Sequence, residues 1–446
     1  MISHKKAVCL ILAAACIARA GMLYSNMQRH PDFFYCNQET VQQKISSNDR
    51  PYLNPFGYEI SSVAYSLVCK HEGFANPFGG STGPTGWVAP GIVIIYALSF
   101  YLFGCFTFAS ILFMFILSFC LSSLMILLIY AVSINIFSNK RIGYINACLF
   151  ASCPQDIFFL GLPAQTEFNI YAFFFLLNFF LCIKFVQSVT LKNLILFSFC
   201  GGISVLFSPV FIFPLSICLL CFVLKYSKSL SVALLYASTS LAIILLLILP
   251  YIVHQKNRLG AWTFIKSNSA FEVFLGNSKG YNGVLVYDLF QSKHPGSNRE
   301  EFQAYKNMGE INYVKSRSNI FFHNLDPLNL VQLTCKRFLN FFFIFEPYIA
   351  PERFSTVRLI FDYIAYALPG LSLLIYLLLQ YKTMSWNDYF IYGYIISYAF
   401  PYMFAGIMYR YSFPICTLTT VLLGNILHRA FSGTYSQNKL FVKKAS

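Results

Sequence analysis

Long apolar runs recur along the whole chain and constrain its fold more than any other feature. One of them, residues 106–137, ends only at the basic pair Lys140 and Arg141. An apolar run of about 18 residues or more is long enough to cross the roughly 30 Å hydrocarbon core of a bilayer as a helix. A membrane barrel would instead show segments of about 10 residues with alternating polarity. Because only 11% of the residues are charged, against about 25% in an ordinary soluble protein, the sequence predicts an all-α, polytopic membrane protein.

Basic residues at the ends of these runs predict the topology, because Lys and Arg are enriched in cytoplasmic loops. The segment "VAPGIVIIYALSFYLFG", within residues 88–105, fits the charge pattern only as a helix lying on the outer surface. We therefore expect about ten spans, both termini inside, and one membrane-embedded domain over residues 1–446. Two large outer segments are expected, 28–105 and 253–356. The predicted spans are 7–24, 106–137, 142–160, 165–186, 190–207, 209–225, 229–252, 357–380, 386–403 and 408–428.

Three further features each leave alternatives open. The first run has Ala-Arg-Ala near its end, as a signal peptide would, but Lys5 and Lys6 before it favour an uncleaved first span. The net charge of +15 fits cytoplasmic Lys and Arg that set topology, and also a basic pocket for an anionic lipid head group. In a membrane chain it does not indicate nucleic acid. Cys36 and Cys69 share one outer segment and would be able to pair in an oxidising compartment.

The first outer segment contains two predicted surface helices. In "EISSVAYSLVCKH" the apolar residues recur at helical spacing, which predicts an interfacial helix over residues 59–71. A second surface helix is expected over about 90–104. Between them lies "NPFGGSTGPTGWVAPG", an uncharged loop rich in glycine and proline. Such a loop connects two helices, and its glycines also permit close approach of backbone to a ligand.

Three stretches carry a resemblance to a known family. "YEISSVAYSLVCKHEGFANPFGGSTGPTGWVAP" resembles the first outer loop of bacterial polytopic glycosyltransferases that use lipid-linked sugars. These are relatives of the protein O-mannosyltransferases and the aminoarabinose lipid A transferases. "HPGSNREEFQAYKNMGEINYVKSRS" resembles their later outer segment, and "YRYSFP", residues 409–414, resembles a motif of their last span. The three matches occur in the family's order across nearly the whole chain.

The resemblance implies a GT-C-type bundle in which two juxtamembrane helices follow the first span. It also implies inverting transfer of a sugar from a polyprenyl-phosphate donor to an acceptor, at the outer face of a bacterial inner membrane. Donor, acceptor and membrane lipids are then the partners, and the acceptor can be a lipid, a glycan or a protein. The sequence shows no cluster with metal-ligand spacing, so we expect no required metal and no cofactor.

Such a transfer needs a carboxylate base for the acceptor and cations for the departing phosphate. Glu59 matches the family's acidic position and is the predicted base, although a carboxylate in the first turn also stabilises a helix through its dipole. Arg410 is the predicted phosphate ligand, against simple snorkelling at a helix end. Lys336 and Arg337 are further candidates for phosphate. The residues expected to line the substrate cavity are Tyr58, Thr82, Thr85, Trp87, Glu167, Tyr409 and Tyr411.

Several of these residues also have ordinary structural interpretations. Glu167 fits a boundary residue at the start of a span, and Tyr409 and Tyr411 fit interface anchors. His294, alone in a turn, is interpreted as structural.

Two other functions remain open. A secondary transporter would carry mid-membrane charges and often a repeat between its halves, and neither is evident in this sequence. A family member that binds a lipid-linked sugar without transferring it is the other alternative. It stays open because Glu59 has no acidic neighbour, unlike the acidic residue of many relatives.

Overall fold

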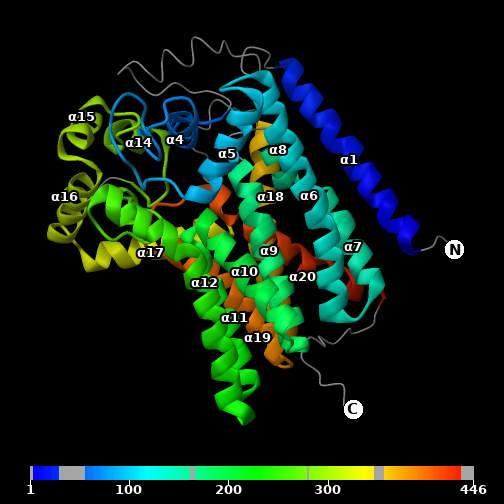
Figure 1. Cartoon of the computed structure of the whole chain (residues 1–446). Helices are drawn as coiled ribbons and strands as arrows, with labels where there is room; N and C mark the ends of the chain where they lie inside the picture. Colours follow the sequence, from blue (N-terminus) through cyan, green and yellow to red (C-terminus); the bar gives the residue numbers. More distant parts are fainter. Residues whose placement is uncertain (1–3, 30–55, 161–165, 279–280, 346–355, 433–446) are drawn as a thin grey trace.

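The computed structural model describes residues 4–29, 56–160, 166–278, 281–345 and 356–432. Helices dominate these residues (Figure 1), and the β-structure among them is limited to two isolated bridges, Ala75 with Pro84 and Val284 with Ile407. This confirms the predicted all-α fold class.

A bundle of apolar helices makes up most of the molecule. Five of the described helices, α1, α6, α9, α12 and α18, are long and apolar enough to cross a membrane. The other predicted spans correspond to helices that are shorter, interrupted or less apolar, so the count of ten stays a prediction. The bundle helices are α1 (His4–Arg29), α6 (Phe108–Phe137), α7 (Lys140–Ala151), α8 (Pro154–Leu160), α9 (Thr166–Gln187), α10 (Leu191–Phe207), α11 (Ile212–Lys225), α12 (Leu230–Leu259), α18 (Thr356–Gln380), α19 (Trp386–Ala399) and α20 (Phe413–Ser432).

The run predicted as one span over 142–160 is broken in two. Helix α7 ends at Ala151, and α8 begins at Pro154. Proline disfavours helical conformation in the residue before it and lacks a backbone N–H, so it sits best at the first position of a helix. The single proline therefore explains why this run forms two short helices.

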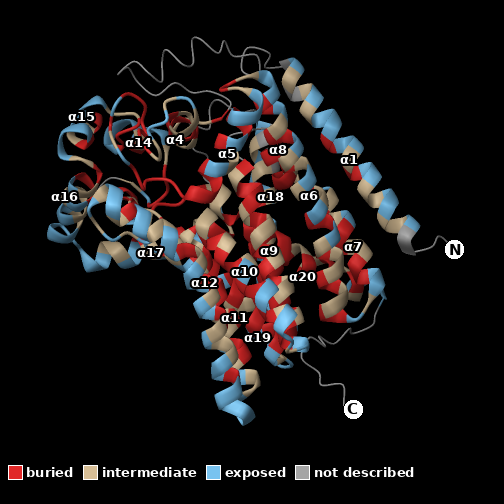
Figure 2. Ribbon diagram, in the orientation of Figure 1, coloured by how far each residue is buried: buried red, intermediate tan, exposed pale blue. Residues whose placement is uncertain are grey.

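Aromatic rings fill the centre of the bundle, and aliphatic residues cover its outside. Between α9 and α19, Phe175 lies 4.8 Å from Tyr394 and Phe179 lies 5.3 Å from Phe390, measured between ring centroids. Figure 2 shows buried residues gathered along the inner faces of the helices and exposed ones on the outer faces. Leu235 and Leu246 on α12 are 63% and 68% exposed. An exposed leucine face is expected where lipid rather than water surrounds the helix.

Helix α1 lies at the edge of the bundle (Figure 1) and is tied to it by a buried ion pair. Arg19 donates from Nε to Asp156 Oδ2 over 3.0 Å, and its Nη2 lies 2.5 Å from the same oxygen. Ser122 on α6 donates to this oxygen over 2.7 Å. A buried charge needs such partners, so the pair fixes the position of α1 against α6 and α8.

Helices α4, α5 and α13–α17 form a second layer, which we call the cap. Its members are α4 (Glu59–Val68), α5 (Pro90–Phe103), α13 (Ser269–Gly276), α14 (Tyr287–Lys293), α15 (Arg299–Met308), α16 (Glu310–His323) and α17 (Pro327–Phe342). In Figure 1, α4 and α14–α16 gather on one side of the molecule, away from the start of α1 and the turn between α6 and α7. The two predicted surface helices therefore exist, within three residues of their predicted ends.

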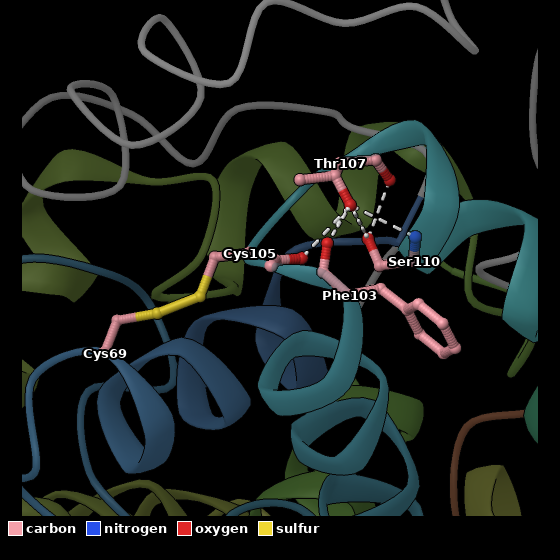
Figure 3. Close-up of a disulfide and its surroundings, with 6 residues drawn as sticks. Cys69, Phe103, Cys105, Thr107 and Ser110 are labelled. Carbon is pink, nitrogen blue, oxygen red and sulfur yellow. Dashed lines mark hydrogen bonds between the residues drawn. A yellow bond between two sulfur atoms is a disulfide. The ribbon is translucent and has the colours of Figure 1, made fainter.

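A disulfide joins the ends of α4 and α5 (Figure 3). Cys69 follows the last residue of α4 and is bonded to Cys105, just after α5. Cys69 is therefore bonded to Cys105 and not to Cys36, the partner that the sequence left open. Cys36 lies outside the described residues. Thr107, next to the bridge, begins α6 by accepting a hydrogen bond from the Ser110 N–H. The disulfide and the capping hydrogen bond of Thr107 together fix both juxtamembrane helices to the start of α6.

Candidate active site

Glu59 is held by two N–H donors on one of its two carboxylate oxygens. Trp87 donates from Nε1 to Glu59 Oε1 over 3.2 Å. His294 Nε2 lies 3.3 Å from the same oxygen. Trp87 is fully buried and His294 is 2% exposed, so both donors are rigidly packed. In the part of the chain that the structure describes, Glu59 Oε2 accepts no hydrogen bond, which leaves this oxygen available to a bound group.

The hydrogen bonds of His294 define its tautomer. The Gly296 backbone N–H donates to His294 Nδ1 over 3.1 Å, and the Tyr58 hydroxyl lies 3.2 Å from the same atom. A backbone N–H has only a donor role, so Nδ1 is unprotonated and the proton of the neutral ring lies on Nε2, facing Glu59. Burial among aromatic rings lowers the pKa of His294 to about 3. The sequence predicted a structural histidine and missed its contact with Glu59.

The surroundings of Glu59 raise its pKa to about 7. Desolvation is the main cause, because the side chain is only 27% exposed and packs beside Trp87. The negative charges of Glu272 and Glu167 add to the rise, whereas Lys266 and the Trp87 hydrogen bond oppose it. A carboxyl group with a pKa near neutrality is suited to accept a proton at physiological pH.

One cation, Lys266, and two further carboxylates act electrostatically on Glu59, and a second cation acts on the same two carboxylates. Lys266 acts electrostatically on Glu59, Glu167 and Glu272, and Arg410 acts on Glu167 and Glu272. We call these five residues the charge cluster. Its members come from α4, α9, α13, the loop before α13, and the 3₁₀ turn Tyr409–Ser412 before α20. The sequence predicted three of them, and it missed Lys266 and Glu272.

The 409–412 turn positions Arg410 through aromatic contacts. The guanidinium carbon lies 4.9 Å from the centroid of Phe168, one residue after Glu167. Tyr411 packs 5.9 Å from Phe168 and stacks at 5.0 Å on Tyr402. Tyr409 instead packs against Phe345 and Tyr366. Both tyrosines are therefore packed inside the protein, and Tyr411 is the one beside the charge cluster.

The glycine-rich loop is ordered by its own side chains. The side-chain oxygen of Asn76 accepts hydrogen bonds from the backbone N–H groups of Thr82 (2.8 Å) and Gly83 (3.0 Å). Gly83 has a φ of 88°, which favours glycine. A Cβ on Gly86 would lie 2.6 Å from the Gln255 side chain. Here the close approach that glycine permits is to α12, a contact that the sequence did not predict.

The two basic residues of α17 differ in accessibility. Lys336 is exposed and donates to Asn282 over 3.1 Å. Arg337 is fully buried and donates to the carbonyls of Met403 (3.0 Å) and Gly276 (2.5 Å), and to the Asn277 side chain. Its guanidinium is therefore used to join α17 to the end of α13. Neither residue belongs to the charge cluster, and the role in phosphate binding predicted for both stays a prediction.

Two other features bear on ligands. A groove of about 380 Å³ lies between α4 and α5, lined by Leu67, Val68, His71, Ile94, Ala97, Leu98 and Tyr101. Its lining begins about 12 Å along α4 from Glu59, at a rise of about 1.5 Å per residue, so it is separate from the charge cluster. Among the residues that the structure describes, no group of three or more His, Cys, Asp or Glu is placed to hold a metal ion.

Comparison with known proteins finds similarity only among solved structures. The oligosaccharyltransferase AglB from Archaeoglobus fulgidus, in complex with an inhibitory peptide and a dolichol-phosphate, is 14% identical, with a TM-score of 0.48 over 95% of this chain and 50% of that chain. Its apo form gives a TM-score of 0.49 at 14% identity and the same coverage. This chain thus spans about half the length of those proteins. ArnT from Cupriavidus metallidurans bound to undecaprenyl phosphate gives 0.39 at 10% identity, over 92% of this chain and 79% of that chain. No family model and no curated protein matches the sequence.

Proposed function

We propose that this chain is a membrane glycosyltransferase that moves a sugar from a polyprenyl-phosphate donor to an acceptor, with Glu59 as general base. The observation that carries the proposal is the geometry of Glu59. One oxygen is fixed by Trp87 and His294, and the other accepts no hydrogen bond from the described residues. The sequence resemblance, whose first stretch contains both Glu59 and Trp87, supports the assignment independently.

The proposed step is an inverting displacement at the anomeric carbon. The acceptor oxygen forms the new bond to that carbon while its proton passes to Glu59 Oε2. The bond between the anomeric carbon and the phosphate oxygen breaks, and the electron pair leaves with the polyprenyl phosphate. His294 stays neutral throughout because its pKa is about 3, so it orients Glu59 without competing for the proton.

Arg410 and Lys266 are the proposed ligands of the departing phosphate. An arginine guanidinium binds phosphate with two parallel hydrogen bonds, and lysine acts as a point charge. In the described residues Lys266 donates no hydrogen bond from its ammonium group, and it is only partly buried. Glu167 and Glu272 are the carboxylates on which both cations act electrostatically, so the proposed phosphate site also contains two negative charges.

The proposed site faces the outside of a bacterial inner membrane. The Cys69–Cys105 bridge lies in the same cap as Glu59, and disulfides persist in oxidising compartments rather than in the cytosol. The basic junctions at Lys140 and Arg141 lie at the end of the bundle away from the cap (Figure 1), in agreement with a cytoplasmic location.

The test is sugar transfer in membranes that contain the wild type, Glu59→Gln or the control Glu300→Gln. Glu300 is an exposed carboxylate on α15, so its replacement should leave transfer unchanged. Radiolabelled polyprenyl-phosphate sugars are supplied as a panel, and label is followed into lipid, glycan and protein fractions. We expect Glu59→Gln to lower transfer at least about 100-fold, as loss of a general base typically does.

The same assay separates the alternatives. Equal transfer by wild type and Glu59→Gln would remove Glu59 from the mechanism. If the wild type binds undecaprenyl phosphate in a detergent assay but transfers no sugar from the panel, the chain is a binding protein and the proposal fails. Arg410→Gln provides the matched test of phosphate recognition, with binding of undecaprenyl phosphate as the readout.

A further inference from the structure

Glu310 is a buried carboxylate that accepts four hydrogen bonds. The Gly86 N–H (2.8 Å) and the Ser267 hydroxyl (2.5 Å) donate to Oε1. The hydroxyls of Thr85 (2.5 Å) and Tyr305 (2.6 Å) donate to Oε2. Glu310 as a whole is only 5% exposed. Four donors on two oxygens satisfy an ionised carboxylate, which explains how this charge is tolerated in the interior.

These donors come from three separate parts of the chain. Thr85 and Gly86 belong to the glycine-rich loop, Ser267 follows Lys266 directly, and Tyr305 lies on α15. The loop and the 267 segment also touch each other, because the Ser267 N–H donates to the Gly86 carbonyl over 2.9 Å. Glu310 therefore lies at the junction of the two chain segments that contribute Trp87 and Lys266 to the proposed site.

A short chain of hydrogen bonds leads from Glu310 to Glu59. The Thr85 hydroxyl that donates to Glu310 also accepts from the Trp87 backbone N–H over 2.9 Å. The indole N–H of Trp87 in turn donates to Glu59. Thr85 thus links the two carboxylates, and its hydroxyl is oriented because its single proton is already committed to Glu310.

We propose that Glu310 is a positioning residue: it fixes Trp87, and hence Glu59, through Thr85, and it fixes Lys266 through Ser267. The catalytic part of this inference rests on the proposed function, but the geometric part does not. Glu310 would not touch the substrate. It sets the distance between the base and one of the cations, which must be right to within a fraction of an ångström for an efficient transfer.

Glu301 provides a matched control in the same cap. It lies on α15 and accepts hydrogen bonds from the Tyr313 hydroxyl (2.7 Å) and from Arg317 Nε (2.9 Å). Like Glu310, it joins α15 to α16 by a carboxylate, but its partners Tyr313 and Arg317 lie on α16, outside the glycine-rich loop and the 267 segment. If Glu310 only stabilised the cap, removal of Glu301 would have the same consequences for Glu59.

The experiment uses Trp87 as a reporter that does not depend on activity. The chain contains three tryptophans, so Trp262→Phe with Trp386→Phe leaves Trp87 alone. Its emission is recorded against pH in detergent, and iodide quenching is recorded at pH 8. The Glu59→Gln variant identifies the part of the titration that belongs to Glu59. His294 does not titrate in this range, and any contribution of Glu272, Glu167 or Glu310 persists in that variant and is subtracted.

We expect Glu310→Ala to loosen Trp87. Its emission should shift to longer wavelength, iodide should quench it more strongly, and the Glu59 midpoint should rise by about one pH unit, because a weakened N–H bond stabilises the carboxylate less. Glu301→Ala should change none of these. Glu310→Gln, whose carbonyl still accepts from Gly86 and Ser267, should lie between wild type and Glu310→Ala.

The proposal would be overturned if folded Glu310→Ala had the same emission, quenching and midpoint as the wild type. It would also be overturned if Glu301→Ala changed these readouts as much as Glu310→Ala does. If Glu310→Ala does not fold, Glu310→Gln and Thr85→Val decide the matter by the same readouts. These results stand even if the wild type transfers no sugar, so failure of this inference is distinct from failure of the proposed function. Where transfer is measurable, the pH midpoint of kcat should move with the fluorescence midpoint.

Discussion

Replacement of Glu59 by glutamine should make the protein more stable at alkaline pH. The folded state raises the pKa of Glu59 from the usual 4.5 to about 7, so it binds this proton more tightly than the unfolded chain does. A raised carboxyl pKa contributes stability that is fully present below the unfolded value of 4.5 and is lost as pH rises toward 7. Glutamine resembles the protonated acid and still accepts from Trp87 and His294 through its carbonyl oxygen, so it avoids this loss.

The size of the effect follows from the two pKa values. At about 1.4 kcal/mol for each pKa unit, the difference between 4.5 and about 7 corresponds to about 3 kcal/mol of unfolding free energy. For a chain of this length, about 3 kcal/mol corresponds to a change of about 3 °C in midpoint temperature. Relative to wild type, the melting midpoint of Glu59→Gln should therefore rise by about this amount between pH 5 and pH 8.5.

Thermal unfolding of the detergent-solubilised protein, followed by intrinsic fluorescence across this pH range, is the appropriate assay. Glu300→Gln serves as the control, because it removes an exposed carboxylate and should follow the wild type at every pH. A constant difference between Glu59→Gln and wild type from pH 5 to 8.5 would refute the reasoning, since it would show that folding does not raise the pKa of Glu59. This assay requires no knowledge of the substrate.

Three further predictions concern contacts described above. Trp87→Phe replaces the indole by a smaller aromatic ring and removes the N–H that favours ionised Glu59, so the pH midpoint of kcat should rise by about one unit; an unchanged profile would contradict the bond. Asp156→Leu leaves Arg19 buried and unpaired and should lower stability by about 3–5 kcal/mol, whereas the double variant with Arg19→Leu should recover much of this loss in thermal melts. Cys69→Ser and Cys105→Ser each open a bridge spanning 36 residues and should each cost about 2–4 kcal/mol, with no additional loss when they are combined; additive losses would argue against the bridge.

Local sequence patterns predicted the juxtamembrane helices well. Glu59 and Pro90 begin helices at the predicted residues, because a carboxylate in the first turn and a proline at the first position are strong helix starts. Glu59, Thr85 and Trp87 lie in one continuous stretch of sequence, so the sequence also placed these three residues in one site. The segment "REEFQAYKNMGEINYVKSRSNIFFH" forms two helices, α15 and α16, because Gly309 between them has a φ of 73°.

The rest of the candidate site is distant in sequence. Lys266, Glu272 and Glu310 are separated from α4 and α5 by more than 160 residues of chain, and no local pattern distinguishes them from ordinary polar residues of a cap helix or loop. A glutamate at the start of a helix, such as Glu310, is usually explained by the helix dipole alone. Its true partners are hydroxyl and amide groups of other segments, which only tertiary structure brings together.

The Cys69–Cys105 bond also determines which part of the cap is able to move. Because it closes residues 69–105 into a covalent ring, the glycine-rich loop and Trp87 are confined to a segment whose two ends cannot separate. Helices α13–α16 have no disulfide within the described residues, and the hydrogen bonds from Thr85 and Gly86 to Glu310 join α16 to that ring. We therefore expect any rearrangement of the cap on substrate entry to be larger in α13–α16, whose contacts are noncovalent, than in the covalent ring 69–105.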